Sequence, residues 1–530
     1  MKKYIQGMKD DLGMERFHKT DCLNSRTSQV GCRMSAWKSW EEYRKDEIWI
    51  TQVPKGGDVP WALFYPADYS VGAASLGYQY VFGRLRSNGI AVERFFLSPI
   101  PYRSVCCDTM LERFSVISAT IAYEGDVPEF FKWLCGAHIP LSPFDRAKAS
   151  FPVVGMGGAL SYINPLLLSG VCDFIVLGDG MEALDYAAEC IRKYGTSERE
   201  KLWKKLAEHD EIFVPPVDVR DNKVIRKMKI GRNLDLNGAY YSHSLWMTAR
   251  GVFGKTLLLE LQRGCARSCS YCTLPNCFGK MRFRKFDIVE KVVKEVSDKF
   301  EVPQVGLVTP EAGDYPLLPQ LLDCIAERNI SVSFASLRID KLDRKMISAL
   351  SGGGRRSITV APETGSEALR FSCGKKFTNE TIIEKLCLAK ECGIDKAKLY
   401  FMVGLPGECE EDISAISVLC GNIIKETGIS LTLSVNPFIP KPHTPWERED
   451  FIGKNTIRQR YGKIKKDMCA LSKKMPLLRL IGVREAITEY TLAWYGYEDS
   501  AELAHSIENG RMELRKTERD RTIEALKNFC

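Results

Sequence analysis

The stretch between residues 60 and 195 alternates short apolar runs with amphipathic segments of helical spacing. The apolar runs are rich in β-branched and aromatic residues, which is typical of buried strands. The predicted strands span 61–69, 91–97, 114–125, 151–158 and 171–178. The predicted helices span 70–89, 127–139 and 181–195. Strands of this kind that alternate with helices indicate an α/β fold with a Rossmann-like, doubly wound parallel sheet.

Glycines follow two of these predicted strands, at Gly157, Gly158, Gly178 and Gly180. In an open parallel sheet, ligands bind beyond the carboxyl ends of the strands, where these glycines are expected to lie. A glycine there lets the backbone come close to a ligand, but it also suits a tight turn between strand and helix. Both interpretations stay open.

A second series of strands and helices runs from residue 251 to about residue 440. Its predicted helices include 286–300 and 378–393, the second of which begins at Thr378 with a capping pattern. The predicted strands span 257–261, 304–309, 331–336, 357–361, 396–404 and 430–437. A parallel α/β series places its functional site at the carboxyl ends of the strands.

These patterns divide the chain into five segments. Residues 1–45 are polar and irregular, and residues 216–250 are charged and lack a period, so we expect an extension and a linker. The two α/β series occupy 46–215 and 251–445, and residues 446–530 have helical patterning without a chemical motif. A chain of 530 residues is expected to form two or three domains.

Composition and charge are those of a globular protein, with 45% hydrophobic residues and 27% charged residues. No apolar run is long enough to span a bilayer, and the N-terminus lacks a secretory signal, so we expect a cytoplasmic protein without a membrane partner. A net charge of +8 does not indicate nucleic acid by itself. The basic stretches 280–285 and 511–521 leave nucleic acid open but unsupported, because the second has acids at helical spacing.

Three closely spaced cysteines are the strongest chemical signal in the chain. Cys265, Cys269 and Cys272 follow the predicted strand 257–261 as C-x3-C-x2-C. Three thiolates on one loop can hold three corners of a 4Fe–4S cluster, and the fourth iron then stays open for chemistry. Gly264 allows the sharp turn into this loop.

A zinc site is the alternative to a cluster, with Cys277 as the fourth thiolate. Zinc sites usually consist of two separated CxxC pairs, whereas these four cysteines crowd into one loop. Most of the other cysteines, out of 19 in total, are scattered singly, as is usual for buried free thiols in a reducing compartment.

The cysteine spacing, with the aromatic Tyr271 before the last cysteine, resembles the radical S-adenosylmethionine (SAM) superfamily. The resemblance implies that 251–445 forms a partial (βα)6 barrel and that the cluster binds and cleaves SAM. It also implies an external electron donor of the flavodoxin or ferredoxin type. What the protein itself supplies is the binding site, the tuning of the cluster and the exclusion of water.

The same resemblance implies a SAM pocket built from the ends of successive barrel strands. Glu311 would contact the SAM amine, although the chain lacks the Gly-Gly-Glu form that is usual there. Arg338 would pair with the SAM carboxylate and Glu363 with the ribose, while structural salt bridges are the alternative for both. The cofactor-binding residues that the resemblance implies are Tyr271, Glu311, Ser336, Arg338, Glu363 and Gly404.

Further segments resemble the subgroup that joins an N-terminal cobalamin-binding-like domain to the barrel. They are "YPADYSVGAASLGYQ", "GMGGALSYINP", "FIVLGDGMEAL", "APETGSEALR", "LYFMVGLPGE" and "VNPFIPKPHTPWE". The resemblance assigns 46–215 to that domain. None of the six histidines lies in a D-x-H-x-x-G setting. Cobalamin therefore binds without a histidine ligand, or the domain is a scaffold that has lost cobalamin, and the sequence leaves both open.

The leading hypothesis is a radical SAM enzyme, with cobalamin-dependent methyl transfer as its candidate reaction. One alternative is radical SAM chemistry without cobalamin, including methylthiolation, because "FIPKPHTPWE" also resembles methylthiotransferases. Those enzymes carry a second cluster on three N-terminal cysteines, a pattern that Cys106, Cys107 and Cys135 do not match. A non-catalytic iron–sulfur or zinc protein is the other alternative. The substrate cannot be read from the sequence.

Overall fold

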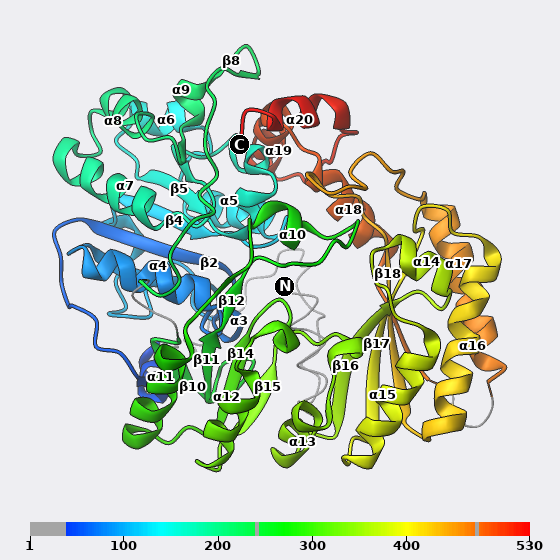
Figure 1. Ribbon diagram of the computed structural model, residues 1–530. Coiled ribbons are helices and arrows are strands. Elements are labelled where there is room, and N and C mark those ends of the chain that lie inside the picture. Colours follow the sequence, from blue (N-terminus) through cyan, green and yellow to red (C-terminus); the bar gives the residue numbers. More distant parts are fainter. Residues whose placement is uncertain (1–38, 239–242, 472–475, 530) are drawn as a thin grey trace, which may run out of the picture.

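A six-stranded sheet forms the centre of the N-terminal unit in the computed structural model, which describes residues 39–238, 243–471 and 476–529 (Figure 1). The strand order is β3-β2-β4-β5-β6-β7, and only β7 runs antiparallel to its neighbour. The strands are β2 (Pro60–Asp68), β3 (Ala91–Ser98), β4 (Val116–Thr120), β5 (Val153–Gly157), β6 (Phe174–Val176) and β7 (Ile212–Phe213). This order reverses between β2 and β4, which is where open α/β sheets bind ligands.

Helices cover both faces of this sheet, so the predicted doubly wound fold is confirmed. One face packs against α4 and α7 through side chains such as Phe82 and Ile191, and the other packs against α5 through Phe130 and Leu134. The expected helix 70–89 is divided in two, because Ser75 is extended and caps the second helix through Tyr78 N. The helices of this unit are α3 (Tyr69–Gly72), α4 (Leu76–Ser87), α5 (Asp126–Gly136), α6 (Pro143–Lys148), α7 (Met181–Tyr194), α8 (Arg199–Leu206) and α9 (Pro215–Asp218).

The C-terminal helices return to the N-terminal sheet. Leu503 and Ile507 of α19 join the same apolar cluster as α5, and the Asn164 side-chain amide donates to the carbonyls of Ala493 and Tyr495, at 3.0 Å each. The helical character of this region agrees with the sequence prediction, but its position against a distant part of the chain was not predicted. The helices are α17 (Lys454–Cys469), α18 (Val483–Ala493), α19 (Tyr497–Glu508) and α20 (Arg519–Leu526).

The second unit is a partial barrel of parallel strands in two separate sheets (Figure 1). All six predicted strands are present, and a seventh, β19, pairs with β18 where the sequence indicated only helix. The first sheet contains β11 (Thr256–Glu260), β14 (Gln304–Val308) and β15 (Ser331–Phe334). The second contains β16 (Ser357–Glu363), β17 (Lys396–Val403), β18 (Ser430–Pro437) and β19 (Leu477–Leu480).

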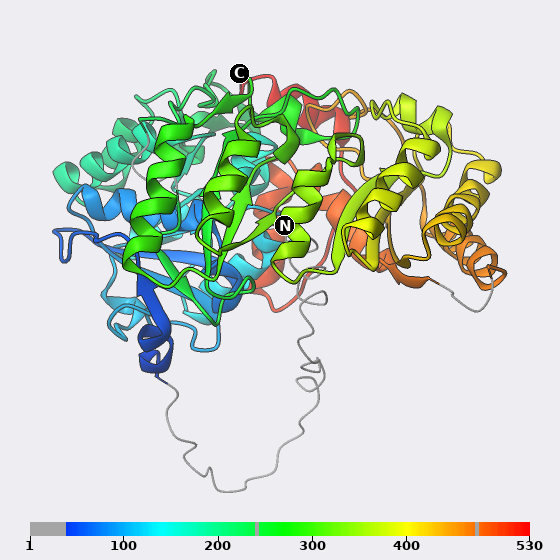
Figure 2. The ribbon, with the colours of Figure 1, turned by 60° about the horizontal axis from the view of Figure 1, so that its bottom comes forward.

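Side chains of the barrel strands alternate between two environments. On β17, Leu399 and Phe401 join the apolar layer beneath the outer helices, whereas Lys398 and Tyr400 take the opposite, inward face. The outer helices are side by side in Figure 2. They are α11 (Phe286–Lys299), α12 (Leu318–Ala326), α13 (Arg344–Gly352), α15 (Asn379–Glu391), α16 (Glu410–Thr427) and α17, with the short α14 (Glu367–Ser372) at the carboxyl end.

The segment 216–250, expected as a linker, contains short strands. β8 (Val219–Arg220) pairs with β9 (Lys223–Val224), and β10 (Trp246–Thr248) pairs with β1 (Glu47–Trp49), which follows α2 (Glu41–Asp46). Gly231 pairs with Gly178 at the end of the N-terminal sheet. The backbone of this segment therefore lies along both units. The five proposed segment boundaries stay a prediction, and the expectation for residues 1–38 lies outside the described residues.

Candidate active site

The three cysteines lie on a loop that leaves the carboxyl end of β11. Gly264 opens the loop at φ +76°, and a Cβ there would lie 2.6 Å from the Lys280 carbonyl oxygen, so only glycine fits. Two backbone hydrogen bonds hold the loop in place. Ser270 N donates to Cys373 O at 3.1 Å, and Trp446 N donates to Ser270 O at 3.2 Å. These contacts hold Ser270, the residue after Cys269, between two distant segments of the chain.

The thiols are largely shielded from solvent. Burial raises the pKa of the Cys272 thiol to about 12 and also raises the pKa of Cys265. Cys269 is buried as well. Metal binding would therefore displace protons from the thiols, because thiolates are the ligand form. The donor set fits an iron–sulfur cluster, for which Cys thiolates are the usual ligands.

Cys277 is separated from these thiols by its packing. It ends the short helix α10 (Thr273–Cys277) and is fully buried in the apolar cluster of the N-terminal unit. No group of three or more His, Cys, Asp or Glu side chains converges on one point within 39–238, 243–471 and 476–529. That arrangement is compatible with a cubane cluster, because each cysteine then binds a different iron atom.

Tyr271 and Glu363, both predicted from the sequence, contact each other. The Tyr271 hydroxyl donates to Glu363 Oε1 at 2.8 Å, and Lys375 Nζ donates to the same oxygen at 2.5 Å. Glu363 sits at the end of β16 at φ +69°, a conformation that costs a non-glycine residue free energy and is frequent at functional sites. The structure thus holds Glu363 in an ion pair, at the position predicted for ribose contact.

Glu311, Ser336 and Arg338 lie together at the ends of β14 and β15. Ser336 O accepts from Ala312 N at 3.4 Å, while Arg338 donates to both oxygens of Asp340 at 3.0 and 3.1 Å. Glu311 is buried, accepts from Gly313 N through Oε1, and has no partner for Oε2 among the described residues. Burial raises the pKa of Glu311 to about 7. A buried carboxylate oxygen without a partner is costly unless a ligand satisfies it.

Gly404 directly follows β17, at the carboxyl ends of the barrel strands. Its φ is +81°, and its N–H donates to Glu408 Oε2 at 2.9 Å. A Cβ at this position would lie 2.5 Å from the Ile452 side chain. The glycine is therefore required by the turn and by packing, whatever binds beyond it.

A cavity of about 560 Å³ lies between the two units. On one side are the carboxyl ends of the N-terminal sheet, with Gly157, Gly158, Gly178 and Gly180, and on the other are the first three barrel strands. Its volume is within the range of cofactor sites. These glycines line the cavity, and Gly178 also packs so closely that a Cβ would lie 2.2 Å from Gly231 O, as a tight turn requires.

The cavity has apolar walls with few polar groups. Gln262 is one of them: it is buried, and neither atom of its terminal amide has a partner among the described residues. No histidine is found among the described residues that line the cavity. A large apolar cofactor with amide or carbonyl groups at its rim fits this combination.

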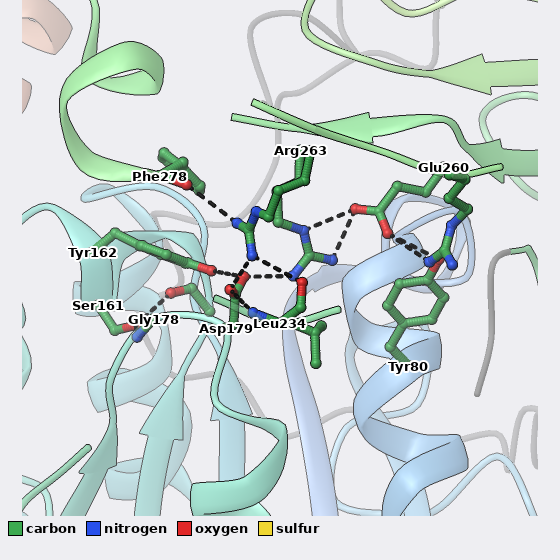
Figure 3. Close-up of polar contacts among 12 residues, drawn as sticks. Tyr80, Ser161, Tyr162, Gly178, Asp179, Leu234, Glu260, Arg263 and Phe278 are labelled. Carbon is green, nitrogen blue, oxygen red and sulfur yellow. Dashed lines mark hydrogen bonds and ion pairs between the residues drawn. The ribbon is translucent and has the colours of Figure 1, made fainter. Parts of the chain in front are cut away.

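An ion-pair network with members that line the cavity joins the two units (Figure 3). Asp179 accepts four hydrogen bonds: from the Tyr162 hydroxyl at 2.6 Å, Arg263 Nη1 at 2.7 Å, Arg282 Nη1 at 2.8 Å and Leu234 N at 3.1 Å. Burial alone would raise the pKa of Asp179, but the Arg263 charge and these hydrogen bonds hold it below its usual value.

Glu260 continues the network inside the barrel. It binds Arg263 through Oε1, and its Oε2 accepts from Arg284 Nη2 at 3.0 Å and from the Tyr80 hydroxyl at 3.3 Å. Arg263 lies on β12 (Gln262–Arg263), and Arg282 lies on β13 (Arg282–Phe283), which pairs antiparallel with β12. Both guanidinium groups therefore reach Asp179 from one pair of strands.

Sequence reasoning missed several of these residues. Asp179 was visible only as part of "LGDGMEAL", and Arg263 only as the residue before Gly264. Lys375 follows Gly374 in "CGKK" without any pattern that marks it. Asp179 and Arg263 are partners 84 positions apart, and Lys375 pairs with Glu363 12 positions before it, so no short spacing indicates either contact.

Two family models match the chain. One is described as the Radical SAM superfamily and covers residues 259–419, and the other is described as Radical SAM proteins, N-terminal, and covers residues 86–215. The first contains the three cysteines and the barrel strands up to β17. The second covers most of the N-terminal sheet.

Curated relatives and a solved structure agree with these matches. An uncharacterized protein of Methanocaldococcus jannaschii is 38% identical over 201 residues, which are 38% of this chain and 44% of that protein. The tRNA-2-methylthio-N(6)-dimethylallyladenosine synthase of Chromohalobacter salexigens is 23% identical over 49% of this chain and 59% of its own length. The chain thus spans about half the length of these relatives.

The radical SAM methyltransferase TsrM of Kitasatospora setae, solved with cobalamin and a 4Fe–4S cluster bound, has a similar fold. It matches with a TM-score of 0.51 and 17% identity, over 74% of this chain and 77% of that one. At this identity the likeness concerns the fold: an N-terminal α/β unit followed by the partial barrel.

We predict that Asp179→Asn loosens the contact between the two units. The change keeps the shape but removes the charge that faces Arg263 and Arg282, and breaking a buried pair costs about 3–5 kcal/mol. Urea unfolding, followed by circular dichroism, should show a matching decrease in the free energy of unfolding. Hydrogen exchange of the backbone amides in 257–263 should accelerate at least about tenfold.

Asp185→Asn is the matched control, because Asp185 pairs with Arg84 within the N-terminal unit and is partly exposed. The free energy of unfolding should fall by less than about 1 kcal/mol in Asp185→Asn. Equal losses in the two variants would mean that the Asp179 network does not hold the units together.

Proposed function

We propose that this chain, which belongs to the radical SAM superfamily, binds a 4Fe–4S cluster through Cys265, Cys269 and Cys272 and cleaves SAM reductively. The observation that carries the proposal is the position of these cysteines on one loop at the carboxyl edge of a parallel barrel. A bound and reduced cluster would supply one electron to SAM, whose sulfonium C–S bond would break to give methionine and a 5′-deoxyadenosyl radical able to abstract hydrogen from the substrate.

Glu311 and Arg338 are suited to the amino-acid part of SAM. The free Oε2 of Glu311 can accept a hydrogen bond from an ammonium group, and this contact would satisfy an otherwise costly buried oxygen. Arg338 uses Nε and Nη2 for Asp340, which leaves Nη1 to donate to a carboxylate. Ser336 lies beside them on the same strand end.

Tyr271, Glu363 and Gly404 are suited to the nucleoside part. Glu363 is fixed by Tyr271 and Lys375 through one oxygen, so its other oxygen has a defined direction for a ribose hydroxyl. Gly404 keeps the backbone accessible at the end of β17 for the adenine. These assignments rest on strand-end position and hydrogen-bonding capacity.

We further propose that the cavity between the units holds cobalamin. Its place at the strand-order reversal of the N-terminal sheet, its volume and its apolar walls support the proposal. The unpartnered Gln262 amide offers a hydrogen bond to one of the side-chain amides of a corrin ring. Because no histidine is present among the described lining residues, none of them would supply a histidine ligand to the metal.

The reaction that these features support best is methyl transfer to an unactivated carbon. A cavity that adjoins the barrel strands below the cysteine loop would let a methyl carrier and SAM serve one substrate. Methylthiolation is the weaker candidate, since Cys106 packs on one face of the N-terminal sheet and Cys135 on the other. Those cysteines therefore do not form a second cluster site.

An external one-electron donor of the flavodoxin or ferredoxin type would complete the reaction, in a cytoplasmic setting that keeps thiols reduced. In the described ranges, no helix has the length and apolar character needed to cross a membrane.

Replacing Cys269 with Ala should abolish both the cluster and the cleavage of SAM, because a cluster site with two thiolates cannot hold three irons. Iron and sulfide content after anaerobic reconstitution, followed by 5′-deoxyadenosine formation with dithionite, measure the two losses. The far-UV circular dichroism of the whole chain should stay unchanged, because the N-terminal sheet stays folded.

Cys277→Ala separates the cluster from a zinc site. We expect about four irons per chain and full SAM cleavage in this variant, since Cys277 is buried in a different apolar cluster. Bound zinc that is lost on Cys277→Ala would contradict the cluster assignment.

SAM affinity should depend on pH through Glu311. Its pKa of about 7 means that the carboxyl is neutral at lower pH and ionised at higher pH. An ammonium group binds the ionised form, so the affinity should fall about tenfold for each pH unit below 7. Equilibrium dialysis between pH 5.5 and 8.5 measures this slope, and Glu311→Gln should remove it while binding SAM weakly throughout.

Filling the cavity should remove cobalamin but spare the cluster. Ala122 lines the cavity and is partly exposed to it, so Ala122→Trp should weaken binding of hydroxocobalamin at least about tenfold by excluded volume. Spectral titration measures the affinity, with the exposed Ala149→Trp as control. Unchanged affinity in Ala122→Trp would mean that cobalamin binds outside this cavity.

A further inference from the structure

One arginine in the middle of the cysteine loop contacts a different strand end of the barrel. Arg267 lies midway between Cys265 and Cys269. Its backbone N–H donates to the Cys265 sulfur at 3.5 Å, and its guanidinium pairs with Asp314 through Nη2. Asp314 follows β14 and lies 47 positions further along the chain. Arg267 therefore joins the first cysteine of the loop to the strand next to β11.

The turn that receives Arg267 also carries Glu311. Glu311 precedes the short 3-10 turn η4 (Ala312–Asp314), and its Oε1 accepts from Gly313 N at 3.0 Å. Asp314 N donates to the Glu311 carbonyl oxygen at 3.4 Å. The two acids thus lie at opposite ends of one hydrogen-bonded turn. A side chain that holds Asp314 also determines where Glu311 lies relative to the cysteine loop.

Further hydrogen bonds anchor this turn to the barrel. Ala312 N donates to Ser336 O at 3.4 Å, and the Tyr315 hydroxyl donates to Arg284 O at 3.0 Å. Because the turn is held on both sides, it is a rigid support for the loop that Arg267 ties to it.

The ion pair between loop and turn is largely shielded from water. Side-chain exposure is 26% for Arg267 and 13% for Asp314. Arg267 Nε and Asp314 Oδ2 are both buried, and neither has a hydrogen-bond partner among the residues that the structure describes. Charges in such surroundings act strongly on nearby groups, because the local dielectric constant is low.

Charges beside an iron–sulfur cluster change its reduction potential. Reduction adds an electron, so a nearby cation favours the reduced form and a nearby anion disfavours it. Here the cation belongs to the cysteine loop itself, and the backbone N–H of the same residue contacts the Cys265 sulfur. The anion, Asp314, belongs to the turn after β14.

We propose that Arg267 is a positioning residue for the cluster: it fixes the cysteine loop to the turn 311–314 through Asp314, and this charge pair sets the reduction potential. The inference rests on the proposed function for the presence of a cluster. The same contact keeps Cys265 and Glu311 at a fixed separation, so that the cluster and the amine end of SAM meet in one geometry.

The midpoint potential of the reconstituted full-length chain, from a redox titration followed by electron paramagnetic resonance, tests the charge pair. Arg267→Met removes the cation but keeps the backbone N–H, so the potential should fall. Asp314→Asn removes the anion, so the potential should rise. Shifts of opposite sign identify an effect of charge, since a merely structural disturbance of the loop has no reason to change sign between the two variants.

Arg267→Lys and Arg356→Met are the matched controls. Lysine keeps the charge, so Arg267→Lys should restore most of the wild-type potential. Arg356 precedes β16 at the opposite end of the barrel, where it pairs with Asp395 at 2.8 Å and is 73% exposed. Its replacement should leave the potential unchanged. Shifts of the same sign in Arg267→Met and Asp314→Asn, or no shift in either, would overturn the proposed tuning.

The positioning role can be measured without a cluster. In the metal-free full-length chain, Arg267→Met should accelerate hydrogen exchange of the backbone amides in 265–270 at least about tenfold, because the loop loses its contact with the turn. Arg356→Met should leave these rates as they are. Unchanged exchange in Arg267→Met would mean that other contacts alone hold the loop, and the positioning role would then fail.

These outcomes can be told apart from those of the proposed function. If the wild-type cluster shows opposite shifts in the two variants but forms no 5′-deoxyadenosine, the role of Arg267 stands and SAM cleavage fails. If the wild type cleaves SAM while the two variants leave the potential and the exchange rates unchanged, the enzyme assignment stands and the role of Arg267 fails. If the wild type binds no cluster, the proposed function fails, and hydrogen exchange decides whether Arg267 fixes the loop.

Discussion

The carboxylate of Asp179 determines how the two halves of the molecule meet. It takes hydrogen bonds from Arg263 and Arg282 of the barrel and from Tyr162 of its own unit, in a place largely closed to water. Buried ion pairs add little net stability, but they strongly penalise any arrangement that leaves a charge alone. Because Arg263 is followed by Gly264 and then Cys265, the contact that docks the units also sets where the cysteine loop begins.

The features that could be predicted from the sequence are those that depend on residues close together in the chain. The six barrel strands, the turn at Gly264 and the three cysteines follow from apolar runs and short spacings, and the structure places them as expected. Asp179 and Arg282 are 103 positions apart, and Asn164 binds carbonyls about 330 positions away, so their contacts have no local signature. β19 was missed because its pattern is half-exposed and short.

Polar atoms without partners point to where ligands complete the structure. Gln262 lies on β12 just after β11, and Glu311 follows β14; both are buried, and each has side-chain atoms that no described residue satisfies. Such groups cost about 1–3 kcal/mol each when they stay unpaired. A ligand that supplies the missing hydrogen bonds recovers this free energy, and its binding therefore stabilises the folded chain.

The barrel strands also carry polar side chains on their inward faces. On β14 to β17 the outward rows are apolar and pack under helices, while the inward rows carry Gln304, Ser333, Thr359 and Lys398. A closed eight-stranded barrel fills its interior with apolar side chains, but a partial barrel with a seam admits water and solutes. Polar inward rows would be costly in a packed apolar core, whereas they are expected where the interior is open to water.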